Sequence, residues 1–378
     1  MKRFRNFIGK VFSHAIFLAN LAAVAWLLLC FVASTISPAD VRHIGLFSLT
    51  IPFAILANMV FVVLWLFSSR KWRSLISVVV LVFCWQMIPA VFGVHYFSSN
   101  NWEKTDSTFK IMSWNVHAMG TFSHPNEKEY SKGIQELISA ESPDILCLPE
   151  FALNAKVKKR TLDDKIMREN GYKEYYFNPD NGYGPDIVLG TAIFSKYPIV
   201  GYKAYELGPY IYLLQCDVQV KSETIVRVCA VHLRSFGLSD NDKAFIEEVK
   251  SRKTEDIEKT RSFVWKFNEA YKLRAEEADK AAAIIEKSPY PVIVCGDFND
   301  LPYSYTYTTI KGELSDAFAK KGRGFGRTYN QIIPTLRIDH ILYSDETLRI
   351  RAFKTMSTVY SDHSPIVANF EIKSSGKD

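Results

Sequence analysis

The chain has 378 residues, of which 48% are hydrophobic, 14% aromatic and 23% charged. This length and composition exclude a disordered tail, a disulfide-stapled miniprotein and a collagen-like repeat, and they leave room for a catalytic domain plus a further segment. The net charge of +6 is unevenly divided, because residues 1–100 carry +7 and residues 101–378 carry −1. The basic balance therefore belongs to the first hundred residues and does not indicate nucleic-acid binding.

Three long apolar runs follow one another in residues 1–100. They cover about residues 15–36, 46–67 and 75–97, and each contains the roughly 20 apolar residues that a helix needs to cross a bilayer. A cleaved signal peptide is the alternative for the first run, but that run is too long and two more follow it. The sequence therefore predicts a membrane anchor of three transmembrane helices, with the lipid bilayer as its partner.

The basic residues between these runs predict the orientation. Four precede the first run and three, Arg70, Lys71 and Arg73, lie between the second and third, whereas the first loop has only Arg42 beside Asp40. The positive-inside rule then predicts a multi-pass plasma (inner) membrane protein with a cytoplasmic N-terminus and an extracytoplasmic catalytic domain. Since the runs contain no Asp, Glu, Lys or Arg, a transporter is disfavoured and anchoring is the expected role.

The rest of the chain is typical of one mixed α/β domain. A polar linker at 101–108 is followed by a domain expected to span 109–373. Helical patterns at 127–140, 155–170 and 241–287 alternate with strands, which favours layered sheets covered by helices. Apolar, β-branched runs bounded by turn residues predict the strands at 109–116, 144–149, 190–195, 211–220, 224–233, 291–296, 338–343 and 365–372.

Polar residues gather at the ends of these predicted strands. Each has a structural explanation of its own as a turn or cap residue. Together they offer several carboxylates, two amides and two imidazoles, a set that suits Mg²⁺ or Mn²⁺ beside a substrate phosphate and does not suit a structural zinc. The six cysteines have neither metal-site nor disulfide spacing, so buried thiols are expected. The strand-end residues are Asn115, Glu150, His232, Asp297, Asn299, Asp339, Asp362 and His363.

Seven short motifs carry a resemblance to a known family. The order in which they occur resembles the endonuclease/exonuclease/phosphatase (DNase I-like) superfamily over roughly residues 108–372, here in a membrane-anchored, bacterial-type form. The resemblance implies a four-layer α/β/β/α sandwich of two mixed sheets with the site at one end between the sheets. The motifs are SWNV (113–116), LPE (148–150), FSKYPI (194–199), VHL (231–233), GDFND (296–300), RIDHIL (337–342) and SDHSP (361–365).

The same resemblance implies a role for each residue. Glu150 is the expected main metal ligand, with Asn115 near the metal and a phosphate oxygen and Asp362 as a further carboxylate on the metal side. Asp297 is expected to orient or deprotonate the attacking water, and Asn299 to bind the phosphate. His232 and His363 are expected to contact phosphoryl oxygens, and Asp339 is expected to hold the His363 ring. Such a set fits in-line phosphoryl transfer, which depends on positioning and on stabilising negative charge.

One position departs from the pattern. Some nucleases of this superfamily have an acid two residues after the strand-end Asn, and this chain has His117 there. The change weakens a second-metal interpretation and disfavours an abasic-site endonuclease. His117 itself is either a substrate contact or an ordinary loop histidine.

The sequence does not decide which class of phosphoester is the substrate. The near-neutral domain offers no broad track for duplex DNA, so nucleic acid is possible but not favoured. A basic run at 156–160 is either a phosphate contact or a solvated face. The segment 235–290 mixes Trp265, Phe267 and other aromatics with basic residues, which is compatible with a helix lying in the bilayer interface or with aromatics packed on the domain.

Our first prediction is a membrane-anchored, Mg²⁺- or Mn²⁺-dependent phosphoesterase that hydrolyses a phosphodiester or phosphomonoester of a lipid-like or small phosphorylated substrate. The alternative is a membrane-tethered extracytoplasmic endo- or exonuclease. An inactive scaffold with the same fold is disfavoured because the set of site residues is complete.

Overall fold

Side-chain alternation along the strands builds the centre of the fold. In β7 (Ile211–Lys221), Leu214, Cys216 and Val218 face one core and Leu213 faces another, as the two-residue period of a strand requires. β7 belongs to a six-stranded sheet ordered β10-β12-β9-β8-β7-β6, and a second six-stranded sheet is ordered β13-β14-β2-β3-β5-β4. The computed structural model describes residues 2–96, 99–120, 127–154, 161–183, 187–237, 240–251, 257–331 and 336–373.

Both sheets are mixed. In the first, β8 and β9 run parallel, and in the second, β2 and β3 do, while the other paired strands are antiparallel. The first sheet consists of β6 (Ile199–Gly208), β7, β8 (Thr224–His232), β9 (Val292–Asp297), β10 (Ser315–Asp316) and β12 (Asp339–Tyr343). The second consists of β2 (Thr108–Ser113), β3 (Ile145–Asn154), β4 (Glu174–Tyr183), β5 (Ile187–Ser195), β13 (Leu348–Thr355) and β14 (Ile366–Ile372).

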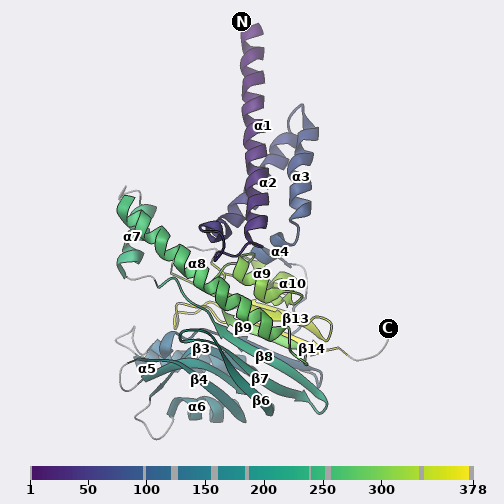
Figure 1. The fold of residues 1–378 in the computed structure, drawn as a ribbon. Coiled ribbons are helices and arrows are strands. Elements are labelled where there is room, and N and C mark those ends of the chain that lie inside the picture. The colour runs from purple at the N-terminus through teal and green to yellow at the C-terminus, as the bar shows by residue number, and fades with distance from the viewer. Residues whose placement is uncertain are drawn as a thin grey trace.

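Helices cover the two outer faces, so the layers run α/β/β/α (Figure 1). α5 (Glu127–Glu141) and α6 (Thr161–Asn170) pack on the second sheet. α8 (Ile257–Ile285) crosses the first sheet, where Ala278, Ala281 and Ile285 form one apolar stripe against it. The domain also contains α7 (Asp240–Lys250), α9 (Tyr305–Lys311) and α10 (Ala317–Lys321). The expected architecture of two mixed sheets is confirmed.

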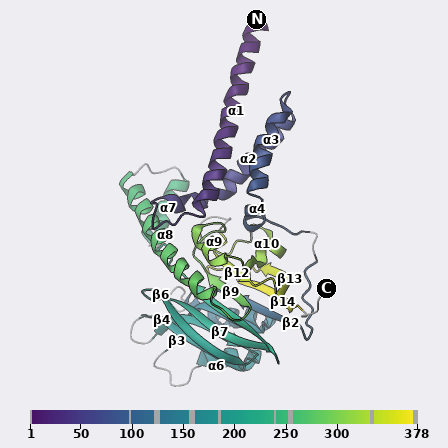
Figure 2. The same ribbon diagram turned by 45° about the vertical axis from the view of Figure 1, so that its right-hand side comes forward.

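Two apolar helices extend from one end of this sandwich (Figures 1 and 2). α1 (Lys2–Ala33) contains a candidate membrane span at Val11–Ala33, and η1 (Ile44–Thr50) continues into α2 (Ile51–Leu66) as a second candidate at Ile44–Leu66. By length and composition alone, these two are the helices in the described residues that are long enough to cross a membrane.

The third predicted span, at 75–97, is not confirmed. This region follows η2 (Lys71–Arg73) as α3 (Ser74–Phe83) and α4 (Met87–Val91), with a break between the two helices, and it ends in β1 (Gly93–Val94). A ten-residue helix rises only about 15 Å, half of a hydrocarbon core. The last part of the run pairs with the domain instead, since β1 is antiparallel to β11 (Arg323–Gly324).

The amino-terminal helices form an antiparallel group that rests on the domain. Within α1, Ser13 Oγ accepts from Arg70 Nη1 at 3.1 Å, and two turns farther along Asn20 Oδ1 accepts from Trp65 Nε1 at 2.8 Å. At the domain end, Thr308 Oγ1 of α9 bonds to the Ser34 carbonyl at 2.5 Å. One apolar core continues from these helices into the first sheet. All six cysteines are buried and unpaired, as the sequence predicted.

Candidate active site

Pairing within each sheet places the predicted site residues side by side. In the first sheet, Asp297 at the end of β9 lies opposite His232 of β8 and Asp339 of β12. In the second sheet, Asn115 follows β2, and the parallel β3 carries Glu150. The parallel pairing of β2 with β3 and of β8 with β9 places the polar groups of each sheet along one edge of the sandwich, where the two sets of groups meet.

Backbone strain marks this edge. Glu150 and Asn299 have φ of 52° and 51°, in the left-handed region that non-glycine residues rarely adopt. Glu150 lies where the β3–β5 register shifts between Leu148 and Phe151, so a bulge sets the direction of its carboxylate. Gly296 has φ of 131°, and a Cβ there would lie 2.0 Å from the Val231 carbonyl oxygen. The strand therefore approaches β8 closely just before Asp297.

The Asn115 amide joins the two sheets. Its Nδ2 donates to Glu150 Oε1 at 2.9 Å and to Asp297 Oδ2 at 3.1 Å. Its Oδ1 accepts from the His117 backbone N–H at 3.0 Å. The nitrogen, not the oxygen, thus faces the carboxylates, so in this structure Asn115 orients Glu150 and Asp297 towards each other.

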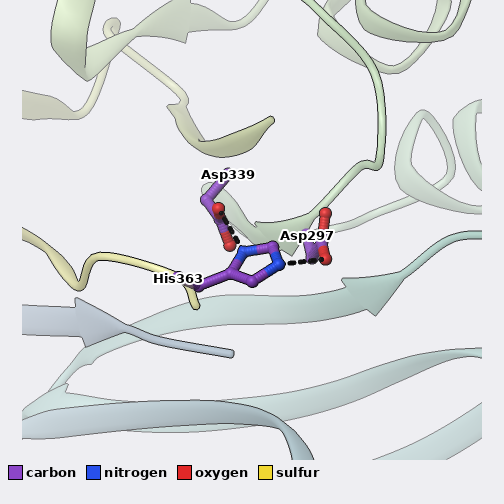
Figure 3. Close-up of side chains that lie close together, drawn as sticks. All are labelled: Asp297, Asp339 and His363. Carbon is purple, nitrogen blue, oxygen red and sulfur yellow. Dashed lines mark hydrogen bonds and ion pairs between the residues drawn. The ribbon is translucent and has the colours of Figure 1, made fainter. Parts of the chain in front are cut away.

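Asp297, Asp339 and His363 form a buried cluster (Figure 3). Asp339 Oδ2 lies 2.9 Å from His363 Nδ1, and Asp297 Oδ2 lies 3.6 Å from His363 Nε2. Burial alone would lower the pKa of His363, but the carboxylates of Asp339 and Asp297 outweigh it and raise this pKa to about 10. Burial raises the pKa of Asp297 to about 6, which His363 only partly opposes and Asp339 reinforces. The three side chains offer ligand atoms within 4.8 Å of one another, so they could themselves hold a metal ion.

The remaining predicted residues surround Glu150. His232 Nε2 lies 3.4 Å from Glu150 Oε1, and His117 Nδ1 lies 3.8 Å from Glu150 Oε2 and 3.4 Å from Asp362 Oδ1. Burial alone would raise the pKa of Glu150, but His232, the Asn115 amide and His117 hold it below its ordinary value. His117 therefore contacts the site, between two of the predicted metal ligands.

Asn299 is placed differently from its expected use. Its backbone N–H donates to Asp297 Oδ1 at 2.8 Å, and its side-chain Nδ2 donates to the Leu233 carbonyl at 2.8 Å. In this structure the residue fixes Asp297 and the loop after His232. The basic run predicted at 156–160 lies outside the described residues.

Three further residues lie near the site, of which only Ser361 belongs to one of the seven motifs. Asp180 of β4 interacts with His232 and Glu150, and burial raises its pKa to about 6. The ring of Tyr329 lies 5.0 Å from that of His363. Ser361 Oγ donates to the Asn115 carbonyl at 2.8 Å and accepts from the His363 N–H, which ties the last motif to the first. The segment around Asp180 contains Pro, Asn and Gly, a composition typical of a turn, so no strand was predicted there.

A family comparison identifies this arrangement. The model described as "Endonuclease/Exonuclease/phosphatase family" matches residues 112–363, about two thirds of the chain. The chain belongs to this family. A second family model, described as a domain of unknown function, matches residues 11–91. No curated protein matches the chain.

Several solved structures are similar to this endonuclease/exonuclease/phosphatase family member. The endonuclease/exonuclease/phosphatase from Beutenbergia cavernae is 18% identical with a TM-score of 0.51, over 70% of this chain and 72% of that one. The human Nocturnin catalytic domain is 19% identical with a TM-score of 0.49, over 72% and 97%. A family protein from Bacteroides thetaiotaomicron is 16% identical with a TM-score of 0.49, over 72% and 100%. Members of the family are hydrolases that act on phosphoesters.

Proposed function

We propose that this chain is a membrane-anchored, divalent-metal-dependent phosphoesterase that hydrolyses a phosphodiester or phosphomonoester of a lipid-like or small phosphorylated substrate through attack by water. The proposal rests chiefly on the Asn115 amide, which brings the carboxylates of Glu150 and Asp297 from two different sheets to one point. A cavity of about 690 Å³ opens on Glu150, Asp297 and His363. Carboxylates, imidazoles and a cavity at one edge are the parts that phosphoester hydrolysis needs.

The donor atoms fit Mg²⁺ or Mn²⁺. Glu150 and Asp362 are hard oxygen donors that flank His117, and the Glu150 side chain keeps 27% of its surface exposed towards the cavity. The cysteines are buried away from it, which disfavours a thiolate-bound zinc. Glu150 and Asp362 would hold the ion with Asn115 beside them. When bound, the ion would polarise the phosphoryl group and neutralise its charge.

The neighbouring residues would supply the rest of the chemistry. Asp297, whose pKa burial raises to about 6, would orient the attacking water and accept its proton near neutral pH. His363 would present a cation to a phosphoryl oxygen, since Asp339 and Asp297 stabilise its protonated form. His232 would contact a second phosphoryl oxygen. Asn299 would act mainly by holding Asp297, because its side-chain amide nitrogen is bound to a carbonyl.

The same proposal places the site outside the cytoplasm. The N-terminus of α1 and the connection between α2 and α3, which carries Arg70, Lys71 and Arg73, both lie on the side of the helical group away from the sandwich (Figure 1). The positive-inside rule favours this end as the cytoplasmic one. The helical group would then anchor the protein in the inner membrane, with α3 and α4 returning the chain to the domain side. An alkaline-phosphatase fusion at the C-terminus should be active, and an inactive fusion would contradict this topology.

A substrate screen tests the activity. We would assay the full chain in lipid nanodiscs, with Mg²⁺ or with EDTA, on phospholipids, inositol phosphates, nucleotides and plasmid DNA. We expect EDTA-sensitive release of phosphate or a phosphorylated head group and no nicking of plasmid. Asp297→Asn should reduce turnover at least a hundredfold without changing the unfolding temperature. Plasmid cleavage alone would favour the nuclease, and near-normal turnover by Asp297→Asn would contradict the assigned roles.

A further inference from the structure

The cavity at the site continues into an apolar chamber. The Asp, Glu and His residues among its described lining residues are all site residues or their direct neighbours: His117, Glu150, Asp297, Asp300, Asp362 and His363. The other walls are mainly aliphatic and aromatic. Charged and apolar lining residues are thus separated along one continuous cavity. Its volume of about 690 Å³ is in the range of sites that enclose small molecules.

A series of aromatic rings forms one wall of the chamber. The series begins at Phe236, four residues after His232, and continues through Phe267 at 4.1 Å and Phe263 at 4.6 Å to Phe245 of α7 at 5.8 Å. All four rings line the cavity. Phe267 therefore lines the chamber, as expected if the aromatics of this segment pack on the domain, whereas Trp265 is exposed.

Another wall of the chamber comes from the amino-terminal helical group. Leu49 of η1 packs against Leu301 and Leu336, and Leu301 is two residues beyond Asn299. α8 holds η1 in place, because the His43 N–H donates to Asn268 Oδ1 at 3.0 Å. η1 begins the second candidate span at Ile44–Leu66, and the helical group meets the sandwich at the domain end of these helices (Figure 2).

We propose that this chamber binds the apolar tail of a membrane-borne phosphate ester whose phosphate lies at Glu150, Asp297 and His363. The inference rests on the proposed function and narrows its substrate to amphiphiles. The separation of charged and apolar lining matches an amphiphile in one orientation only. The position of Leu49 beside a candidate span would let a tail enter the chamber from the bilayer without crossing water, which an apolar chain avoids.

A chain-length series tests the chamber. The substrates are ethyl, butyl, hexyl and octyl p-nitrophenyl phosphates, assayed with the full chain in nanodiscs and Mg²⁺. We expect kcat/KM to rise with chain length by up to about fourfold per methylene buried. Two variants alter the wall: Leu49→Asn, and Val249→Asp at a half-exposed lining residue of α7 that tolerates a polar side chain. Each should reduce the octyl-over-ethyl ratio of kcat/KM at least tenfold.

A matched control separates the chamber from general surface effects. Ile257→Asp makes the same kind of change as Val249→Asp at a highly exposed α8 residue outside the cavity lining, and it should keep the wild-type ratio. If kcat/KM of the wild type did not rise with chain length, the proposal would be overturned. An equal loss in Ile257→Asp and Val249→Asp would also overturn it.

A binding measurement distinguishes this proposal from the proposed function. If the wild type hydrolyses none of the four esters, we would titrate octylphosphonate and ethylphosphonate into the full chain by calorimetry, against empty nanodiscs. Tighter binding of octylphosphonate that Val249→Asp abolishes would support the chamber while the activity fails. Equal binding of the two phosphonates would overturn the chamber.

Discussion

Asp339→Asn is the most informative single change at the site, because it alters charge without altering shape. Asp339 and His363 are almost fully buried, and their hydrogen bond of 2.9 Å joins an imidazole to a carboxylate. Hydrogen bonds to charged groups contribute about 1.5–3 kcal/mol. His363 must stay protonated and fixed in place to bind the developing phosphoryl charge. Loss of the hydrogen bond from Asp339 should therefore reduce kcat by about tenfold to a hundredfold.

The direction of the pKa change agrees with this expectation. Burial alone lowers the pKa of His363, and Asp339 is the largest of the groups that raise it. An amide at position 339 leaves only Asp297 and the other nearby acids to hold the proton. The ring should then lose its proton at lower pH than in the wild type, and KM should change less than kcat because the substrate's other contacts remain.

The assay is steady-state kinetics on the best substrate from the screen, with the unfolding temperature measured in parallel. Asp316→Asn is the matched control. Asp316 is another buried carboxylate on the first sheet, but it pairs with Arg337 at 3.0 Å and accepts from Tyr307, so its change should affect stability and not kcat. The reasoning would be refuted if Asp339→Asn kept kcat within twofold of the wild type, or if Asp316→Asn lost as much.

Three further predictions concern the metal, the backbone and the stability of the fold. Glu150→Gln should raise the Mg²⁺ concentration that gives half-maximal rate at least tenfold, and added Mg²⁺ should restore part of the rate; an unchanged Mg²⁺ titration would exclude Glu150 as a ligand. Gly296→Ala should abolish activity or folding, because its Cβ would meet the Val231 carbonyl at 2.0 Å; wild-type turnover would show that β8 and β9 can separate freely. Arg337→Met should destabilise the chain by about 3–5 kcal/mol, because it leaves the buried Asp316 without its cation; an unchanged unfolding temperature in nanodiscs would contradict this.

Sequence patterns predicted the central strands but not the edges of the sheets. β8 and β9 consist mainly of apolar, β-branched residues because both of their faces are buried, and such runs are recognisable without a structure. β4 and β6 were not predicted. Each is the last strand of its sheet, and many of their side chains lie partly or fully in solvent, so their sequences lack the apolar run.

Hydropathy also did not indicate that the third apolar run is broken into two short helices and ends against the domain. The run at 75–97 contains no Asp, Glu, Lys or Arg, as is true of the two before it, yet its helix breaks after Phe83. The Ala90 carbonyl then accepts from Arg337 at 2.7 Å, and β1 pairs with β11. These partners are distant in sequence, so the contacts that end the helical run do not appear in local composition.

The residues alone determined the chemical inventory of this protein, since carboxylates, amides and imidazoles that follow apolar strands have few structural uses in such numbers. Which of them act together was decided by tertiary structure. His340 and His363 both neighbour an Asp in sequence, but His340 is buried between Arg337 and the Asp300 carbonyl, whereas His363 reaches Asp339 and Asp297. The difference arises because the pairing of strands from two sheets fixes the direction of each side chain, and no local pattern encodes that direction.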